Sequence, residues 1–139
     1  MAARFMITFA QYIHEKTVFD YLLFPPEGRE LEIATEISKM KTSSKYVYRG
    51  MSTAEYKNLV KNKKVVSRGV GNTRDITGSY VASSIQLAGR FALRAWKDKG
   101  RAVLLTLDRS KLPPLQQADP GNFWVEYIPL DAVVSKYDL

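Results

Sequence analysis

The chain has 139 residues, 45% of them hydrophobic and 25% charged, as is ordinary for a globular protein with a real core. It has no cysteine and a single histidine, His14, which excludes disulfides, thiolate nucleophiles and cysteine-ligated zinc and argues against a histidine-rich metal site. The net charge of +7 suits an anionic partner such as a nucleic acid, a nucleotide or an acidic protein surface, and it equally suits lysines that only solvate the surface.

The first third of the chain is predicted to be helical. Apolar residues recur at helical spacing over residues 4–24, with a break near Thr17 left open, and over 29–40, and the Pro-Pro-Glu-Gly run at 25–28 separates the two expected helices. We find no basic start followed by a long apolar block, and no stretch of about 18 apolar residues. We therefore expect neither a secretory signal nor a membrane span, and a cytoplasmic protein.

From residue 46 the pattern becomes rich in strands. Residues 46–50 (YVYRG) predict a strand, and Ser52 with Glu55 forms a capping box that begins a helix to about residue 62. Further strands are predicted at 64–67, 79–82, 102–107, 123–128 and 132–137, a helix at 84–97, and loops at 68–78 and 108–122. This order predicts a single α+β domain over 1–139, with a helical segment at 1–44 and a β-rich body at 45–139.

The first candidate site is the Arg49-Gly50 pair at the end of the first predicted strand. Arginine offers a fork of donors that fits phosphate or ribose groups, and glycine lets a ligand approach the backbone. A surface arginine before a helix would give the same pattern, so the pair alone leaves both interpretations open.

The second candidate site is the segment 78–92, in which a short strand leads through a Ser-Ser turn into a helix. Tyr80 lies near the start of that helix and Phe91 two turns along it. Two rings in these positions are placed to form the walls of a slot for a flat ring, although core aromatics would produce the same pattern.

The third candidate site is Glu126, the one charged residue in its predicted strand. With a strand period of two, Glu126 shares a face with Trp124 and Ile128, where a carboxylate is costly unless it has a partner or a function. The opposite assignment puts Glu126 in water and buries its neighbours Val125 and Tyr127.

The order of these features resembles the ADP-ribosyltransferase superfamily. They are the strand ending in Arg-Gly, the Gly-x-Tyr-x-Ala-Ser-Ser segment, the proline-rich loop and the strand glutamate. The resemblance covers about residues 46–137 and implies split antiparallel sheets that grip NAD. It implies that Arg49 contacts the phosphates or ribose of NAD and that the Gly50 backbone helps to hold the nicotinamide amide. Tyr80 and Phe91 would match the aromatic pair that sandwiches the nicotinamide ring.

The resemblance also implies the catalytic carboxylate. Glu126 would match the glutamate that hydrogen-bonds the nicotinamide ribose and stabilises an oxocarbenium-like transition state. The Tyr-Arg-Gly opening belongs to the arginine-serine-glutamate branch, whereas the tyrosine segment belongs to the histidine-tyrosine-glutamate branch. Ser79 and Ser83 are the candidate serines for NAD binding and for orienting the glutamate. Trp124 stands where the serine branch often has a glutamate or glutamine that selects the acceptor, so the acceptor stays open.

The implied activity is mono-ADP-ribosyl transfer from NAD to a macromolecular target, a protein or a nucleic acid. The nicotinamide leaving group is already cationic, so a bent dinucleotide and one carboxylate beside the developing charge suffice, without a metal or a further cofactor. The small chain fits a phage factor, a toxin or an effector, and no oligomeric state follows from it. Arg109, Lys111, Gln116 and Gln117 stand in the loop where the family carries its target-recognition residues.

Three alternatives to ADP-ribosyl transfer stay open. One is a related enzyme on the same fold, such as an NAD glycohydrolase or an RNA phosphotransferase. Another is a basic nucleic-acid- or protein-binding module that keeps the fold without catalysis. The last, a nucleic-acid-binding protein unrelated to this fold, depends on the net charge alone. A Glu126 side chain that faces solvent away from the cleft would favour the binding module.

Overall fold

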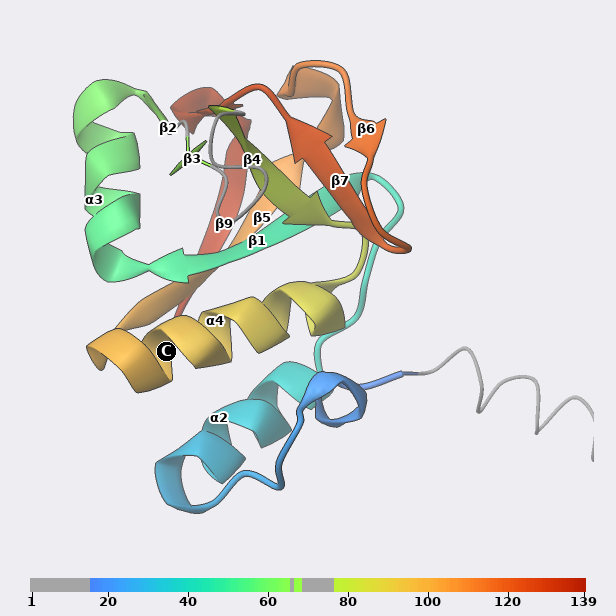
Figure 1. The fold of residues 1–139 in the computed structure, drawn as a ribbon, viewed down its shortest axis with the longest axis vertical. Helices are drawn as coiled ribbons and strands as arrows, with labels where there is room; N and C mark the ends of the chain where they lie inside the picture. The colour runs from blue at the N-terminus through green and yellow to red at the C-terminus, as the bar shows by residue number, and fades with distance from the viewer. Residues whose placement is uncertain (1–15, 66, 69–76) are drawn as a thin grey trace, which may run out of the picture.

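The computed structural model describes residues 16–65, 67–68 and 77–139, and Figure 1 shows that they surround one main antiparallel sheet. The strands on its main path are β1 (Tyr46–Ser52), β4 (Thr77–Ala82), β5 (Ala102–Asp108), β6 (Gln116–Gln117), β7 (Asn122–Val125) and β9 (Val133–Asp138). Their spatial order is β6-β7-β4-β1-β5-β9, and β3 (Ser67–Arg68) also pairs with β4. A small second sheet joins β2 (Lys64–Val65) to β8 (Ile128–Pro129). This arrangement confirms the predicted α+β class.

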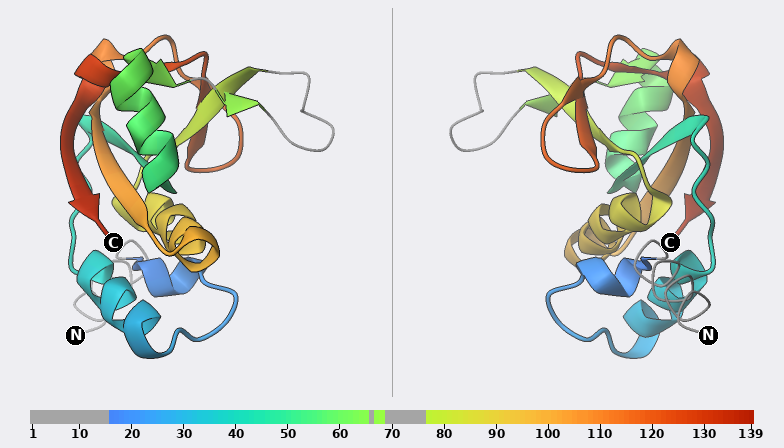
Figure 2. Two further views of the ribbon diagram at one scale, coloured as in Figure 1. Left: turned by 90° about the vertical axis from the view of Figure 1, so that its left-hand side faces the viewer. Right: turned by 90° about the vertical axis from the view of Figure 1, so that its right-hand side faces the viewer.

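Helices cover both faces of the main sheet, with α4 (Ile85–Lys99) on one face and α3 (Thr53–Asn62) on the other. The remaining helices are α2 (Gly28–Ser38) and the 3₁₀ helix η1 (Val18–Tyr21). Figures 1 and 2 show that α2 and η1 lie on the side of α4 that faces away from the sheet. The order of layers is therefore α3, the sheet, α4, and then α2 with η1.

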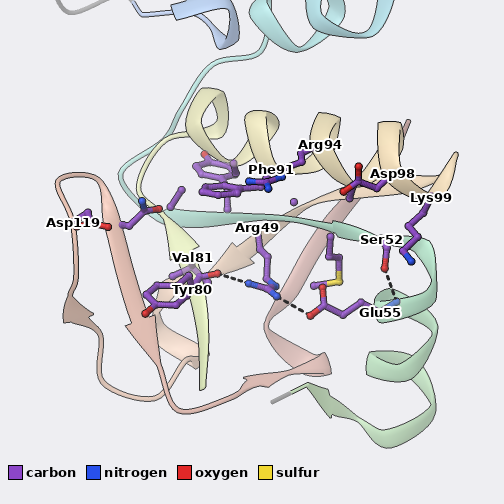
Figure 3. Close-up of a pocket in the computed structure, with 17 residues that line it drawn as sticks. Arg49, Ser52, Glu55, Tyr80, Val81, Phe91, Arg94, Asp98, Lys99 and Asp119 are labelled. Atoms are coloured by element: carbon purple, nitrogen blue, oxygen red, sulfur yellow. Dashed lines mark hydrogen bonds and ion pairs between the residues drawn. The ribbon is translucent and has the colours of Figure 1, made fainter. Parts of the chain in front are cut away.

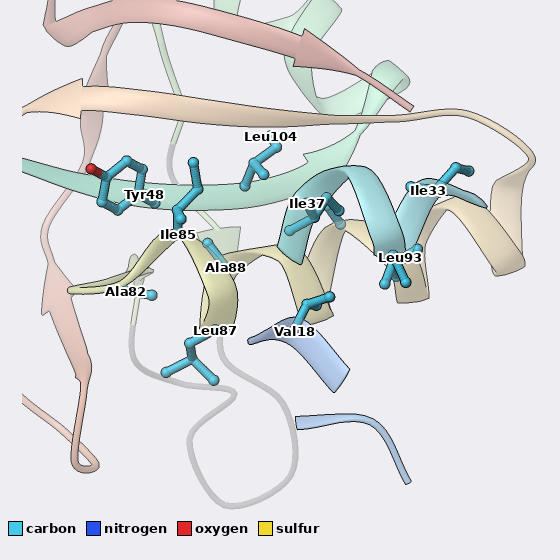
Figure 4. Close-up of a cluster of buried hydrophobic side chains, with 12 residues drawn as sticks. Val18, Ile33, Ile37, Tyr48, Ala82, Ile85, Leu87, Ala88, Leu93 and Leu104 are labelled. Carbon is cyan, nitrogen blue, oxygen red and sulfur yellow. The ribbon is translucent and has the colours of Figure 1, made fainter. Parts of the chain in front are cut away.

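The alternation of side chains along the central strands separates two apolar cores. Tyr48 of β1 and Leu104 of β5 point toward α4, and Figure 4 shows the core that they share with Ile37 of α2 and Leu93 of α4. Val47, next to Tyr48, belongs to the second core on the α3 side. Because successive strand residues face opposite sides, one strand supplies both cores.

The helical segment before β1 is fixed to α4 by a buried amide. Gln86 is 5% exposed, and its Nε2 donates to the carbonyl of Ile37 at 2.9 Å and to that of Met40 at 2.8 Å. Ile37 lies in the last turn of α2 and Met40 two residues beyond its end, where carbonyls have few helical donors. The Ile37 carbonyl also accepts from the Met40 backbone N at 2.9 Å, so the glutamine adds to the hydrogen bonds at the C-terminal end of α2 and joins that end to α4.

The predicted body elements are largely confirmed. The strand at 46–50 is β1, the helix at 84–97 is α4, and the strands at 102–107 and 132–137 are β5 and β9. The serine half of the predicted capping box is also present, because the Ser52 hydroxyl accepts from the Glu55 backbone N at 3.1 Å, whereas the Glu55 carboxylate pairs with Arg49. Local signals decided these elements, since strand alternation and helix caps depend on near neighbours.

The predicted helix at 4–24 is wrong where the structure describes it. Residues 1–15 lie outside the described part of the chain, and the rest contains only the single turn of η1. The Asp20 carboxylate accepts from the Thr17 backbone N at 2.7 Å, which closes this turn on itself. Pro25 and Pro26 then prevent the chain from continuing as a helix.

The predicted strand at 123–128 is interrupted, which corrects the expected face of Glu126. Val125 pairs with Ser79 in the main sheet, whereas Ile128 pairs with Val65 in the small sheet. Val125 and Ile128 are both fully buried although they are three residues apart. The period of two breaks because the chain leaves one sheet for the other between these residues.

The predicted loop at 108–122 holds more structure than expected, namely the 3₁₀ helix η3 (Arg109–Lys111) and β6. Asp108 caps η3, and the hydrogen bonds that its carboxylate accepts from the Ser110 hydroxyl and backbone N lower the pKa of Asp108. Of the predicted loop at 68–78, residues 69–76 lie outside the described part of the chain.

Gly50 of β1 lies directly against the backbone of α4. A Cβ at this position would lie 2.8 Å from Ala92 Cα and closer still to Ala92 N and Ala88 O. A Cβ on Gly89 would instead meet Ile37 Cγ2 at 2.7 Å, and that atom belongs to a side chain. The first contact is with backbone atoms of α4, whereas the second is with a single methyl group of α2.

We therefore expect Gly50→Ala to lower the free energy of unfolding by about 3 kcal/mol, because α4 must shift from β1. Gly89→Ala is the matched control, with a smaller expected loss of about 1–2 kcal/mol, since its closest contact is with one methyl group of Ile37 and alanine favours the helix. Denaturant unfolding of both variants measures the difference. Equal losses would contradict the close contact between β1 and α4.

Candidate functional site

The main sheet opens between β1 and β4. β1 pairs with β5 along its whole length, from Tyr46 to Ser52, but with β4 through the single pair Tyr48 and Ala82. On its other edge β4 pairs with β7 from Ser79 to Ala82. Beyond the Tyr48–Ala82 pair, β1 and β4 therefore border a gap in the sheet.

A cavity of about 510 Å³ occupies this gap (Figure 3). Its size falls within the roughly 300–1,000 Å³ that small-molecule sites usually have. Its walls come from β1, the first turn of α3, β4, one side of α4 and the turn before β7. The cavity is thus a consequence of strand topology, and no single loop creates it.

Arg49 spans the gap. Its Nη1 donates to the Tyr80 carbonyl of β4 at 2.7 Å, and its Nη2 forms an ion pair with Glu55 Oε1 of α3 at 2.7 Å. In a continuous ladder this carbonyl would face β1, so the guanidinium occupies the place of the missing strand pairing. The side chains of Arg49 and Glu55 are 14% and 24% exposed, so the ion pair is partly screened from water.

Two aromatic side chains line the cavity from different elements. Tyr80 of β4 is 42% exposed and Phe91 of α4 is 39% exposed. Figure 3 shows Phe91 on the helix wall and Tyr80 on the strand wall. Partly exposed rings at a cavity are available to stack on a flat ligand, whereas core rings are not.

Charged side chains lie farther along the helix wall. Arg94, Asp98 and Lys99 follow Phe91 at spacings that keep them on one side of α4, and all three line the cavity. Neither Arg94 nor Lys99 forms an ion pair with any residue that the structure describes. These two cations are therefore available to an anionic ligand.

The two candidate serines do not line the cavity. Ser79 is 1% exposed and faces the α3-side core with Val81, and its hydroxyl has no hydrogen-bond partner among the described residues. Ser83 is half-buried in the turn before α4, where its backbone N donates to the Gly121 carbonyl at 2.8 Å. Of the predicted cofactor-binding set, the structure brings Arg49, Gly50, Tyr80 and Phe91 together.

Glu126 is exposed and does not line the cavity either. It directly follows Val125, the last residue of β7, and stands two positions beyond Trp124, the β7 residue that pairs with Tyr80 of β4. The carboxylates that do line the cavity belong to Glu55, Asp98 and Asp119.

Of these, the sequence marked only Glu55, and only as a helix cap. Because β1 continues directly into α3 at Ser52, a charge near the end of the strand and one in the first helical turn lie close together. The spacing of Arg49 and Glu55 around a capped strand-to-helix junction is therefore the signal that identifies their pairing.

Comparison of the chain with protein-family models, with curated proteins and with solved structures found no match. In residues 16–65, 67–68 and 77–139, no helix has the length and apolar character needed to cross a membrane. The same residues contain no group of three or more acidic or histidine side chains able to hold a metal ion. The assignment of a function to this cavity therefore depends on its geometry and on the sequence resemblance.

If Tyr80 and Phe91 serve a ligand, their removal should cost little stability. We expect Tyr80→Ala and Phe91→Ala each to lower the free energy of unfolding by less than about 2 kcal/mol, because both rings keep much of their surface in water. Tyr48→Ala is the control, with an expected loss of about 3–5 kcal/mol, since Tyr48 is 2% exposed. Thermal unfolding compares the three variants, and a loss at Tyr80 or Phe91 as large as at Tyr48 would assign that ring to the core.

Proposed function

We propose that the cavity between β1 and β4 binds NAD and that the protein is a mono-ADP-ribosyltransferase acting on a protein or nucleic-acid target. One observation carries the proposal: Arg49, Tyr80 and Phe91, from three separate elements, line a cavity at the place where the sheet splits. The sequence resemblance assigns these residues to NAD and implies a split sheet. The agreement between residues and topology supports the proposal more than either alone.

The lining fits the parts of a dinucleotide in order. A flat ring suits the aromatic end of the cavity, near Tyr80 and Phe91. Arg94 and Lys99 lie three and eight residues farther along α4, roughly 5 and 12 Å at 1.5 Å per residue. Since Glu55 already compensates the charge of Arg49, these two cations are the better partners for the diphosphate.

Transfer of ADP-ribose from NAD requires few catalytic groups. The bond between ribose C1′ and the nicotinamide nitrogen breaks, nicotinamide leaves as a neutral molecule, and the acceptor bonds to C1′ and loses its proton. One carboxylate beside the ribose stabilises the positive charge that develops there. In this proposal Glu126 supplies it, from its position just beyond the Tyr80–Trp124 pair.

A second candidate function is a basic module that binds a nucleic acid or a protein without catalysis. The position of Glu126 favours it, because this side chain is exposed and lies outside the cavity lining. In that case the net charge of +7 would serve an anionic partner, and the cavity would not turn over NAD.

The test combines calorimetry with NAD and assays of nicotinamide release and ADP-ribose transfer in a cell lysate. We expect the wild-type protein to bind NAD, and Glu126→Gln to lower kcat by about 100-fold or more with little change in the dissociation constant. Glu36→Gln on α2 is the control, since Glu36 is exposed and, among the residues that the structure describes, forms an ion pair with Lys39 alone.

The outcomes separate the candidates. Nicotinamide release without labelling of any target would assign a glycohydrolase. NAD binding with release unaffected by Glu126→Gln would remove Glu126 as the catalytic carboxylate. A wild-type protein that neither binds nor cleaves NAD would contradict the proposed function and leave the binding module.

A further inference from the structure

We propose that Glu55 is a positioning residue, which fixes the Arg49 guanidinium across the gap between β1 and β4 in the orientation that meets the ligand. The part that concerns NAD rests on the proposed function. Glu55 is distinct from Glu126, the carboxylate expected to act on the ribose.

The guanidinium is held from two sides of the gap. Glu55 lies in α3, which follows β1, and the Tyr80 carbonyl lies in β4 (Figure 3). A guanidinium is planar and carries its donors in a fixed fork, so two contacts through different nitrogens determine both its position and its plane. Loss of the Glu55 contact removes one of the two contacts that fix the plane of the group.

Glu55 is itself held in place. Its backbone N donates to the Ser52 hydroxyl at 3.1 Å, in the cap that begins α3. Farther along α3, Leu59 is fully buried in the core on that side of the sheet. The carboxylate therefore extends from a capped and anchored helix, which is the kind of support that orients a neighbouring charge.

The surroundings of this ion pair differ from those of a surface pair of the same length. Arg29 and Glu32 on α2 also meet at 2.7 Å, but their side chains are 67% and 66% exposed. Pairs in water hold their geometry weakly, because solvent screens the attraction and both side chains remain free to move. The pair of Arg49 and Glu55, at 14% and 24% exposure, is the one able to fix an orientation.

Removal of the Glu55 charge has two effects of opposite sign on an anionic ligand. Simple electrostatics predicts that Glu55→Gln strengthens the binding of NAD, because the site becomes more positive. Loss of positioning predicts weaker binding, because Arg49 no longer points at the ligand. The direction of the change therefore distinguishes a positioning residue from a mere counter-charge.

The experiment measures NAD affinity by calorimetry, KM and kcat by nicotinamide release, and the Arg49 guanidinium signals by NMR. For Glu55→Gln we expect the dissociation constant and KM to rise about tenfold, a greater change than that in kcat. We also expect the separate Nη signals of Arg49, which report restricted rotation, to merge. Glu32→Gln, which breaks the exposed pair, should change none of these quantities.

Three results would overturn the inference: tighter NAD binding by Glu55→Gln, an unchanged Arg49 signal, or a loss in kcat alone, which would make Glu55 the catalytic carboxylate. If Glu55→Gln does not fold, Glu55→Asp distinguishes a positioning residue from a counter-charge, because it keeps the charge and withdraws the carboxylate by one methylene. If the wild-type protein binds no NAD, the proposed function fails, and the Arg49 signals still show whether Glu55 fixes the guanidinium.

Discussion

The structure depends on how closely α4 approaches β1. Gly50 has no side chain, so the backbone of α4 at Ala88 and Ala92 rests directly on the strand. This contact brings one side of the helix up to the sheet, while on its far side Gln86 and Gly89 receive α2 and η1. The same helix therefore joins the N-terminal segment to the sheet and forms one wall of the cavity. A larger residue at position 50 would disturb the core and the cavity together.

The cavity exists because β1 and β4 share only the pair of Tyr48 and Ala82. In a continuous ladder, backbone groups of these strands would satisfy each other and leave no room for a ligand. Here the Arg49 guanidinium takes the carbonyl that the split exposes, and Glu55 balances its charge. The Arg49 side chain therefore satisfies a backbone carbonyl that β1 leaves unpaired, and the same side chain lines the cavity. This double role is the reason to regard Arg49 as the centre of the site.

The two candidate functions, ADP-ribosyltransferase and binding module, differ in what they require of the Glu126 carboxylate. Arg49, Tyr80 and Phe91 line the cavity whichever of the two functions holds. Catalysis requires a carboxylate at the ribose, and Glu126 follows the end of β7 instead of lining the cavity. The chain changes from the main sheet to the small one just after this point. The position of Glu126 is thus set by a junction between two sheets, where local pattern gives little guidance.

The sequence by itself determined the elements that depend on near neighbours: the capped start of α3 at Ser52, the strand that carries Arg49, and the helix that carries Phe91. It also singled out four residues that line the cavity together. Only the tertiary structure decided that β1 and β4 separate, that Glu55 pairs with Arg49, that Ser79 faces the core, and that the strand at 123–128 divides between two sheets. The physical reason is that capping and periodicity act over a few residues, whereas strand pairing and burial depend on contacts between distant parts of the chain.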